Sequence, residues 1–248
     1  MKIRLITGVS VVLASTLALT ACGSKSDDAA SDTKAAAPAS SAPAAGALDA
    51  LTGQQILDKA KTALKSAKSY HVAGSMTEDG DKTTVDLKIA GNDVIGFIQT
   101  KEGKIELLSV GSQRFFRPSS EFWTAQGADG KTIAQVIGKR WVKIDAKDTD
   151  TASMFAITNM EEILEPEGTV EKAGTKQIDG KQALGLTDTV EGKGGVLYVA
   201  AEGETYPLRL DGPTAADGSL AFTEYGETFA DIKAPVAADV FDMKNLGK

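Results

Sequence analysis

The chain contains one histidine, His71, and one cysteine, Cys22, and these single copies limit the chemistry that it can perform. A serine or cysteine nucleophile would have to use His71 as its base, and the sequence identifies no group that would orient it. A zinc site made of several cysteines and histidines is excluded, as is a disulfide within the chain. The residues around His71 alternate between apolar and polar, and His71 is on the polar side, as a surface histidine would be. We therefore expect no catalytic role for this residue.

Two groups of acidic residues are spaced closely enough to act together: Glu161, Glu162, Glu165 and Glu167, and Asp145, Asp148 and Asp150. Paired carboxylates can serve as acid and base, as in glycosidases, or bind calcium. Neither group has the oxygen spacing of a calcium-binding loop, and solvated surface positions account for both. Residues 192–195 (GKGG) stand between two expected strands, whereas a phosphate-binding loop leads into a helix. We expect no enzyme, no metal and no cofactor, with a carboxylate-based glycosidase as the enzyme alternative.

The composition is that of a folded protein that does not bind nucleic acid. Of 248 residues, 42% are hydrophobic and 25% are charged, which is enough apolar material to form a core. The formal net charge is −7, and the lysines and arginines are scattered rather than gathered in a basic stripe. Nucleic acid is therefore not an expected partner.

Residues 1–22 carry the most specific pattern in the sequence. An apolar stretch follows Lys2 and Arg4, which is typical of a secretory signal peptide rather than of a membrane-spanning helix. Its last four residues, LTAC, resemble the lipobox of bacterial lipoproteins. The resemblance implies cleavage after Ala21 and attachment of a diacylglyceryl group, with acyl chains such as palmitate, to Cys22. The alternative is an ordinary signal peptide or an uncleaved anchor in which the cysteine is incidental.

We expect residues 22–48 to be the lipidated cysteine and a flexible tether, which separate the signal peptide at 1–21 from a single domain at 49–248. The tether consists mainly of alanine, serine and proline, and it has too few apolar side chains to offset the entropy lost on ordering. Cleavage removes Lys2 and Arg4, so the formal charge falls from −7 to −9. Two acyl chains suffice for stable anchoring, so the lipid would hold the exported protein on the outer face of the cell membrane.

The remaining sequence predicts an α+β fold. Apolar residues recur at helical spacing from Ile56 to Ala67, with Thr52 as the N-cap. The period then changes to two, and turns with Asp-Gly or similar pairs separate short alternating runs, which predicts an antiparallel meander over residues 70–117. The other expected elements are helices at 122–137 and 151–164, a strand at 140–144, a second meander at 170–225 and a helical turn at 235–241.

The order of these elements resembles that of actinobacterial lipoproteins of the LppX/LprG type. The resemblance covers nearly all of residues 49–246 as a pattern. It is carried by short segments: 64–72 (LKSAKSYHV), 138–144 (GKRWVKI), 178–181 (IDGK), 206–210 (YPLRL) and 234–235 (AP). It implies the fold of the LolA/LolB carriers, in which a large curved antiparallel sheet, a half-barrel, has a few helices packed on its concave face. Some members of the family carry acylated lipids in a cavity between the sheet and the helices, and others have no known ligand.

A lipid cavity of this kind would be lined by one alternating set of strand residues and by the inner side of the helices. The candidates are Val85, Leu87, Ile89, Phe97, Leu107 and Leu197 from strands, and Met154, Phe155, Ile157 and Met160 from the helix at 151–164. For each of them, the alternative is that it fills a dry core.

The expected function is that of a membrane-anchored envelope lipoprotein that binds or carries a lipid or lipoconjugate without a covalent bond. The alternative is a ligand-free lipoprotein of the same fold with a structural, sensing or partner-binding role. Trp123 and Trp141 either contact a membrane surface or fix a helix onto the sheet.

Overall fold

The structure, a computed structural model, describes residues 48–78, 80–127, 129–144, 154–189 and 195–242. The expected signal peptide, Cys22 and most of the tether lie outside these residues, as do Asp145, Asp148 and Asp150. In the described part of the chain, no helix is long and apolar enough to cross a membrane.

The first helix, α1 (Gly53–Ala67), begins and ends where the sequence predicts. The Thr52 hydroxyl accepts a hydrogen bond from the Gln55 amide at 3.2 Å, and the Gln55 side chain accepts one from the Thr52 amide at 2.9 Å. This reciprocal capping box satisfies two amides that the first helical turn leaves unpaired. At the other end, Lys68 takes a left-handed conformation with φ 65° and terminates the helix.

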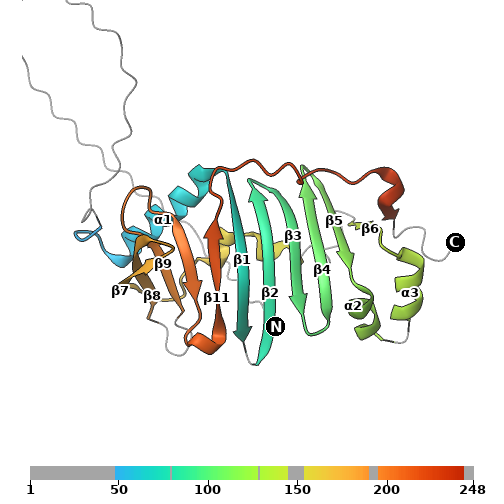
Figure 1. Cartoon of the computed structure of the whole chain (residues 1–248), viewed down its shortest axis with the longest axis horizontal. Helices are drawn as coiled ribbons and strands as arrows, with labels where there is room; N and C mark the ends of the chain where they lie inside the picture. The colour runs from blue at the N-terminus through green and yellow to red at the C-terminus, as the bar shows by residue number, and fades with distance from the viewer. Residues whose placement is uncertain (1–47, 79, 128, 145–153, 190–194, 243–248) are drawn as a thin grey trace, which may run out of the picture. The chain divides into compact units, whose positions relative to one another are not determined.

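Both predicted meanders are present. The first comprises β1 (Ser69–Glu78), β2 (Asp81–Ala90), β3 (Asp93–Thr100), β4 (Gly103–Val110) and β5 (Gln113–Pro118). The second comprises β7 (Val170–Ile178), β8 (Lys181–Asp188), β9 (Val196–Ala200), β10 (Pro207–Asp211) and β11 (Gly218–Thr223). The pairing of β1 with β11, which are far apart in the sequence, joins the two meanders into one sheet (Figure 1).

Two short strands extend the sheet beyond β5. The strand β6 (Trp141–Lys143) pairs with β5, and β12 (Val240–Asp242) pairs with β6 in the parallel sense. We expected only a helical turn at 235–241, and the structure has the short helix η3 (Ala237–Asp239) followed directly by β12. Within the described residues, the sheet has twelve strands in the order β12-β6-β5-β4-β3-β2-β1-β11-β10-β9-β8-β7, and only the β12–β6 pair is parallel. The predicted α+β class with one large antiparallel sheet is therefore confirmed.

The helix expected at 122–137 is two helices, α2 (Ser120–Ala125) and α3 (Gly130–Ile137). They pack so closely that a Cβ at Gly130 would lie 1.7 Å from the Trp123 carbonyl oxygen, so α3 can begin there only with a glycine. Both helices lie at the β5–β6 end of the sheet (Figure 1).

The helix expected at 151–164 is also divided, into the short 3₁₀ helix η1 (Met154–Thr158) and α5 (Met160–Ile163). The division falls at Asn159, whose side chain accepts a hydrogen bond from the Glu162 amide and so caps α5 as a new helix. One more 3₁₀ helix, η2 (Ala215–Asp217), leads into β11.

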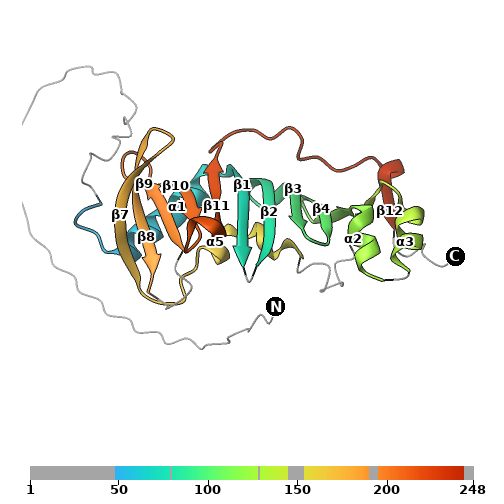
Figure 2. The same cartoon turned by 60° about the horizontal axis from the view of Figure 1, so that its bottom comes forward.

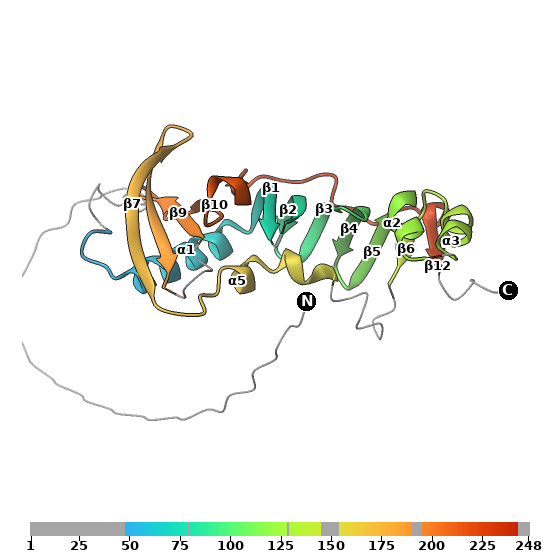
Figure 3. The ribbon, with the colours of Figure 1, turned by 90° about the horizontal axis from the view of Figure 1, so that it is seen from below.

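Helices α1 and α5 lie on the same side of the sheet (Figure 3), and we call this side the inner face. Two buried apolar clusters occupy it. The α1 cluster includes Ile56, Leu57, Ala60 and Leu64 of α1, Met160 and Leu164 near α5, and Val72, Leu87, Leu197 and Phe222 of the sheet. The α3 cluster consists of Ile105, Leu107, Phe116, Ile137, Val142, Ile144, Phe155 and Phe241. The two clusters position every element that contributes to the candidate site.

Candidate functional site

Five of the six strand candidates lie together on the inner face. Val85, Leu87 and Ile89 of β2 are buried in the α1 cluster, as is Leu197 of β9, and Leu107 of β4 is buried in the α3 cluster. The register of the sheet explains why they share a face, because Leu87 and Leu107 both pair with Gly96, which lies between them on β3.

Phe97 does not belong with the other candidates. It pairs with Asp86 on β2 and with Glu106 on β4, one residue out of phase with Leu87 and Leu107, so its side chain is on the opposite, outer face of the sheet. There its ring lies 4.1 Å from the Lys104 ammonium. The inward-facing residues of β3 are instead Val94, Gly96 and Ile98.

The four candidates expected on one helix are divided between η1 and α5. Met160 is buried in the α1 cluster and Phe155 in the α3 cluster. Met154 is partly buried against the α3 cluster, and Ile157 is partly buried against both clusters. The short helix η1 therefore lies over the boundary between the two clusters.

Along this boundary, apolar side chains border the buried clusters but keep part of their surface exposed. Ile98 of β3 and Ile157 of η1 each contact both clusters, and four further partly buried side chains pack against the α3 cluster. We call this set the seam: Ile98, Phe122, Trp123, Ile133, Met154 and Ile157. Next to Ile98 on the inner face, Gly96 has no side chain, and a Cβ there would lie 2.0 Å from the Asp86 carbonyl oxygen.

The sequence analysis missed Ile98 and Ile133 and left the role of Trp123 open. The alternation of β3 could have identified Ile98 once Gly96, rather than Phe97, was taken as an inward position. Trp123 packs its ring 6.3 Å from that of Phe116 and so fixes α2 onto the sheet. Its indole nitrogen is buried and has no hydrogen-bond partner in the described part of the chain.

Trp141 occupies the outer face. It is buried there with Leu108 and Phe115, and the Arg117 guanidinium lies 4.3 Å from the centre of its ring. Arg117 is in turn paired with Glu106 at 2.6 Å. Trp141 is thus part of the sheet's own packing.

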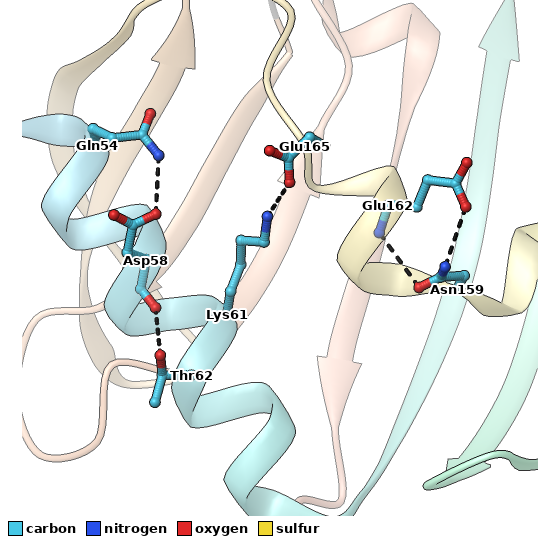
Figure 4. Close-up of polar contacts among 7 residues, drawn as sticks. All are labelled: Gln54, Asp58, Lys61, Thr62, Asn159, Glu162 and Glu165. Atoms are coloured by element: carbon cyan, nitrogen blue, oxygen red, sulfur yellow. Dashed lines mark hydrogen bonds and ion pairs between the residues drawn. The ribbon is translucent and has the colours of Figure 1, made fainter. Parts of the chain in front are cut away.

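Polar contacts connect α1 to the segment that follows it on the inner face. The Lys61 ammonium of α1 forms an ion pair with Glu165, which lies just beyond α5 (Figure 4). On the same face, burial raises the pKa of the Tyr70 phenol above its ordinary value, and the charge of Glu161 adds to the rise. Glu161 and Glu165 thus lie near separate partners, and among the described residues no group of acidic, histidine or cysteine side chains could hold a metal ion.

His71 lies on the outer face, as its position in the alternating pattern predicts. Its Nε2 is 2.8 Å from an Asp86 carboxylate oxygen on the neighbouring strand, and its Nδ1 is 3.9 Å from Glu224. The two carboxylates hold the ring between β2 and the end of β11, which is a structural arrangement within the sheet.

An open groove of about 470 Å³ lies between the β3–β4 turn and α2 and is lined by Lys101, Glu102, Ser120, Glu121, Thr124 and Ala125. Five of its six lining residues are polar or charged, and Lys101 is already paired with Asp81 at 2.8 Å. The large apolar side chains lie in the seam instead, which makes the seam the better candidate for an acyl chain.

Comparison with known proteins finds similarity only to solved structures, and this is a similarity of fold. No protein-family model matches the chain, and no curated protein matches it. Among solved structures, the chain is similar to the Mycobacterium tuberculosis lipoprotein LppX, with 16% identity and a TM-score of 0.46 over 71% of this chain and 96% of that one.

Two further structures show the same kind of likeness. LprF from Mycobacterium bovis has 14% identity and a TM-score of 0.45, over 74% of this chain and 96% of that one. An uncharacterized conserved protein from Thermus thermophilus has 12% identity and a TM-score of 0.40, over 76% of this chain and 98% of that one. The resemblance to LppX/LprG-type lipoproteins that the sequence indicates is a resemblance of fold.

Proposed function

We propose that this chain is a membrane-anchored envelope lipoprotein whose domain binds an acylated lipid or lipoconjugate on its inner face, along the seam. The observation that carries the proposal is the seam itself, a set of large apolar side chains that pack against the buried clusters without being completely buried. Each methylene that an acyl chain removes from water there is worth about 0.8 kcal/mol. An acyl chain lying along these side chains would therefore gain free energy with every carbon in contact.

The anchoring part of the proposal comes from the sequence. A lipid on Cys22 keeps the domain near a bilayer, where lipids to be bound are concentrated. Binding by apolar contact needs no reacting group, which agrees with a chain that has a single histidine, placed on the outer face between two carboxylates.

A second candidate function is a ligand-free lipoprotein with a scaffolding or sensing role. It is favoured by the packing below the seam, where the protein's own side chains fully bury Leu87 and Leu107. Most of the cavity candidates are buried in the two clusters in the same way. The two candidates differ in whether lipid occupies the partly exposed positions.

Two residues of β3 provide a matched test. Ile98 belongs to the seam on the inner face, whereas Ile95 is a partly buried isoleucine on the outer face of the same strand. The full-length protein and the variants Ile98→Gln and Ile95→Gln would be purified from bacterial membranes and compared by native mass spectrometry with organic extraction. We expect extractable lipid on the wild type and on Ile95→Gln, and severalfold less on Ile98→Gln. Absence of lipid from all three would favour the scaffolding role.

A further inference from the structure

We propose that Arg114 selects lipids with an anionic headgroup, a phosphate or a carboxylate, and holds that headgroup at one end of the seam. The inference rests on the proposed function and adds to it a residue and a ligand class. It comes from the position of Arg114 on the inner face and from the partners of the neighbouring arginines.

The register of the sheet places Arg114 on the inner face. It pairs with Ser109 on β4, and Ser109 pairs with Val94 on β3. Val94 is buried in the α1 cluster. Two residues further along β5, Phe116 is buried in the α3 cluster and pairs with Leu107. Arg114 and Ser109 therefore form a polar end to an otherwise apolar face.

The Arg114 guanidinium also lies against η1, a helix that forms part of the seam. It is 5.4 Å from the centre of the Phe155 ring in η1, and η1 contributes Met154 and Ile157 to the seam. Two strand residues span about 7 Å. Phe116 is two residues from Arg114 on β5, and its ring is 6.3 Å from that of Trp123. An acyl chain whose headgroup lies at Arg114 would therefore pass Phe116 and extend towards Trp123.

Three arginines lie in β5 and just before β6. Among the described residues, only Arg114 of these three has no hydrogen-bond acceptor for its guanidinium. The Arg117 guanidinium donates to Glu106 at 2.6 Å. Arg140 donates to the carbonyl oxygens of Val136 and Ile137 at the end of α3. Arg114 is exposed, and beside its ring contact with Phe155 its guanidinium makes no hydrogen bond to another described residue, so its donors face a ligand from that side.

A guanidinium in this position suits an amphipathic anion. Its planar donors match the two oxygens of a carboxylate or phosphate, and such charge-assisted pairs are about twice as strong as neutral hydrogen bonds. Because Arg114 is exposed, a headgroup bound to it would stay partly in water while the acyl chain contacts the seam. In a chain with a net charge of −7, a cation that has no ion pair among the described residues is the feature that would favour an anionic over a neutral lipid.

The test compares an anionic with a neutral lipid of the same acyl chain. Full-length protein in phosphatidylcholine nanodiscs would be titrated with a photoreactive oleate analogue and with the corresponding photoreactive monoacylglycerol, and the crosslinked fraction measured. The variants are Arg114→Gln, Arg114→Lys and, as a control, Lys143→Gln, which removes an exposed cation from the outer side of β6.

We expect the wild type to prefer the oleate analogue, and Arg114→Gln to weaken oleate labelling about tenfold while leaving monoacylglycerol labelling unchanged. Arg114→Lys should retain part of the preference, and Lys143→Gln all of it. An unchanged ratio in Arg114→Gln would overturn the inference, including the case in which that variant is only less stable. Competition by millimolar inorganic phosphate would assign Arg114 to a free anion and also overturn it. If the wild type binds neither lipid, the proposed function itself fails, whereas equal binding of both leaves that function standing and removes only the role of Arg114.

Discussion

Lys61 and Glu165, which are 104 residues apart, form an ion pair between α1 and the segment after α5 (Figure 4). Lys61 is on the second half of α1, and Glu165 follows Leu164, which is buried in the α1 cluster. In the view of Figure 2, α1 and α5 lie close together at the β7–β10 end of the sheet. The pair connects the two helical segments that cover this part of the inner face.

We predict that Lys61→Met loosens α5 without unfolding the protein. The Glu165 side chain is 64% exposed, so the pair is largely screened by water and contributes less than about 1 kcal/mol to stability. The helix α5 has only four residues, so losing the ion pair should increase its local opening. Hydrogen exchange of the amides at 160–164 would measure the change.

Lys59 provides the control, because it is exposed on α1 and has no ion pair in the part of the chain that the structure describes. Lys59→Met should leave exchange at 160–164 as in the wild type. Equal protection in both variants would show that the buried side chains of Met160 and Leu164 alone fix α5.

We predict that Leu87→Ala lowers the free energy of unfolding by about 2–5 kcal/mol, since Leu87 is fully buried and its loss leaves a cavity in the α1 cluster. Ile98→Ala should cost less, because Ile98 keeps part of its surface exposed at the seam. Urea unfolding of both variants would measure the difference. If Ile98→Ala is as destabilising as Leu87→Ala, Ile98 is a core residue and the seam is not available to a ligand.

The helix α1 and the first hairpins could be predicted because the sequence signals for a helix cap, an alternating strand and a turn are local. The alternation of β1 and β2 and the Thr52 cap were sufficient to define α1 and the first hairpins. The pairings β1–β11 and β12–β6 were not predictable in the same way, since they join segments that no local pattern relates.

The candidate site shows the same limit. Phe97 was assigned to the inner face because it is large and apolar, but its neighbour Gly96 is the residue in phase with Leu87. Because glycine has no side chain, its hydropathy does not show which face of the sheet it is on. Which residues of β3 face inward is therefore known only from the register of β3 with β2 and β4. The partial exposure of Ile157 and the contact of Arg114 with the Phe155 ring are properties of tertiary packing, and no spacing in the sequence records them.

We predict a loss of stability in acid that depends on Asp211. Burial would raise the pKa of its carboxyl, but hydrogen bonds from Arg209 at 2.6 Å and Lys176 at 2.7 Å outweigh burial and hold the pKa below its ordinary value of 3.8. A carboxyl with a lowered pKa contributes its full stability above the unfolded value of 3.8 and loses it as the pH falls through the folded value. Wild type should therefore lose more stability between pH 6 and pH 3 than Asp211→Asn.

Thermal unfolding across this range would measure the difference. Asp129→Asn controls for the loss of one negative charge, because the Asp129 side chain makes no hydrogen bond at the start of α3. An acid dependence in Asp211→Asn equal to that of the wild type would show that the hydrogen bonds from Arg209 and Lys176 do not couple folding to pH.

Finally, we predict that Cys22→Ala releases the protein from the membrane fraction. The resemblance of LTAC to a lipobox makes Cys22 the residue that would carry the acyl chains. Labelling with a fatty-acid probe, followed by separation of membrane and soluble fractions, would measure both consequences, and we expect the variant to be unlabelled and soluble. Ser24→Ala, two residues further along, should remain labelled and membrane-bound. A Cys22→Ala protein that stays with the membrane would mean that an uncleaved signal anchor holds it, and lipid exchange at the seam would then have to occur with the domain attached through that anchor.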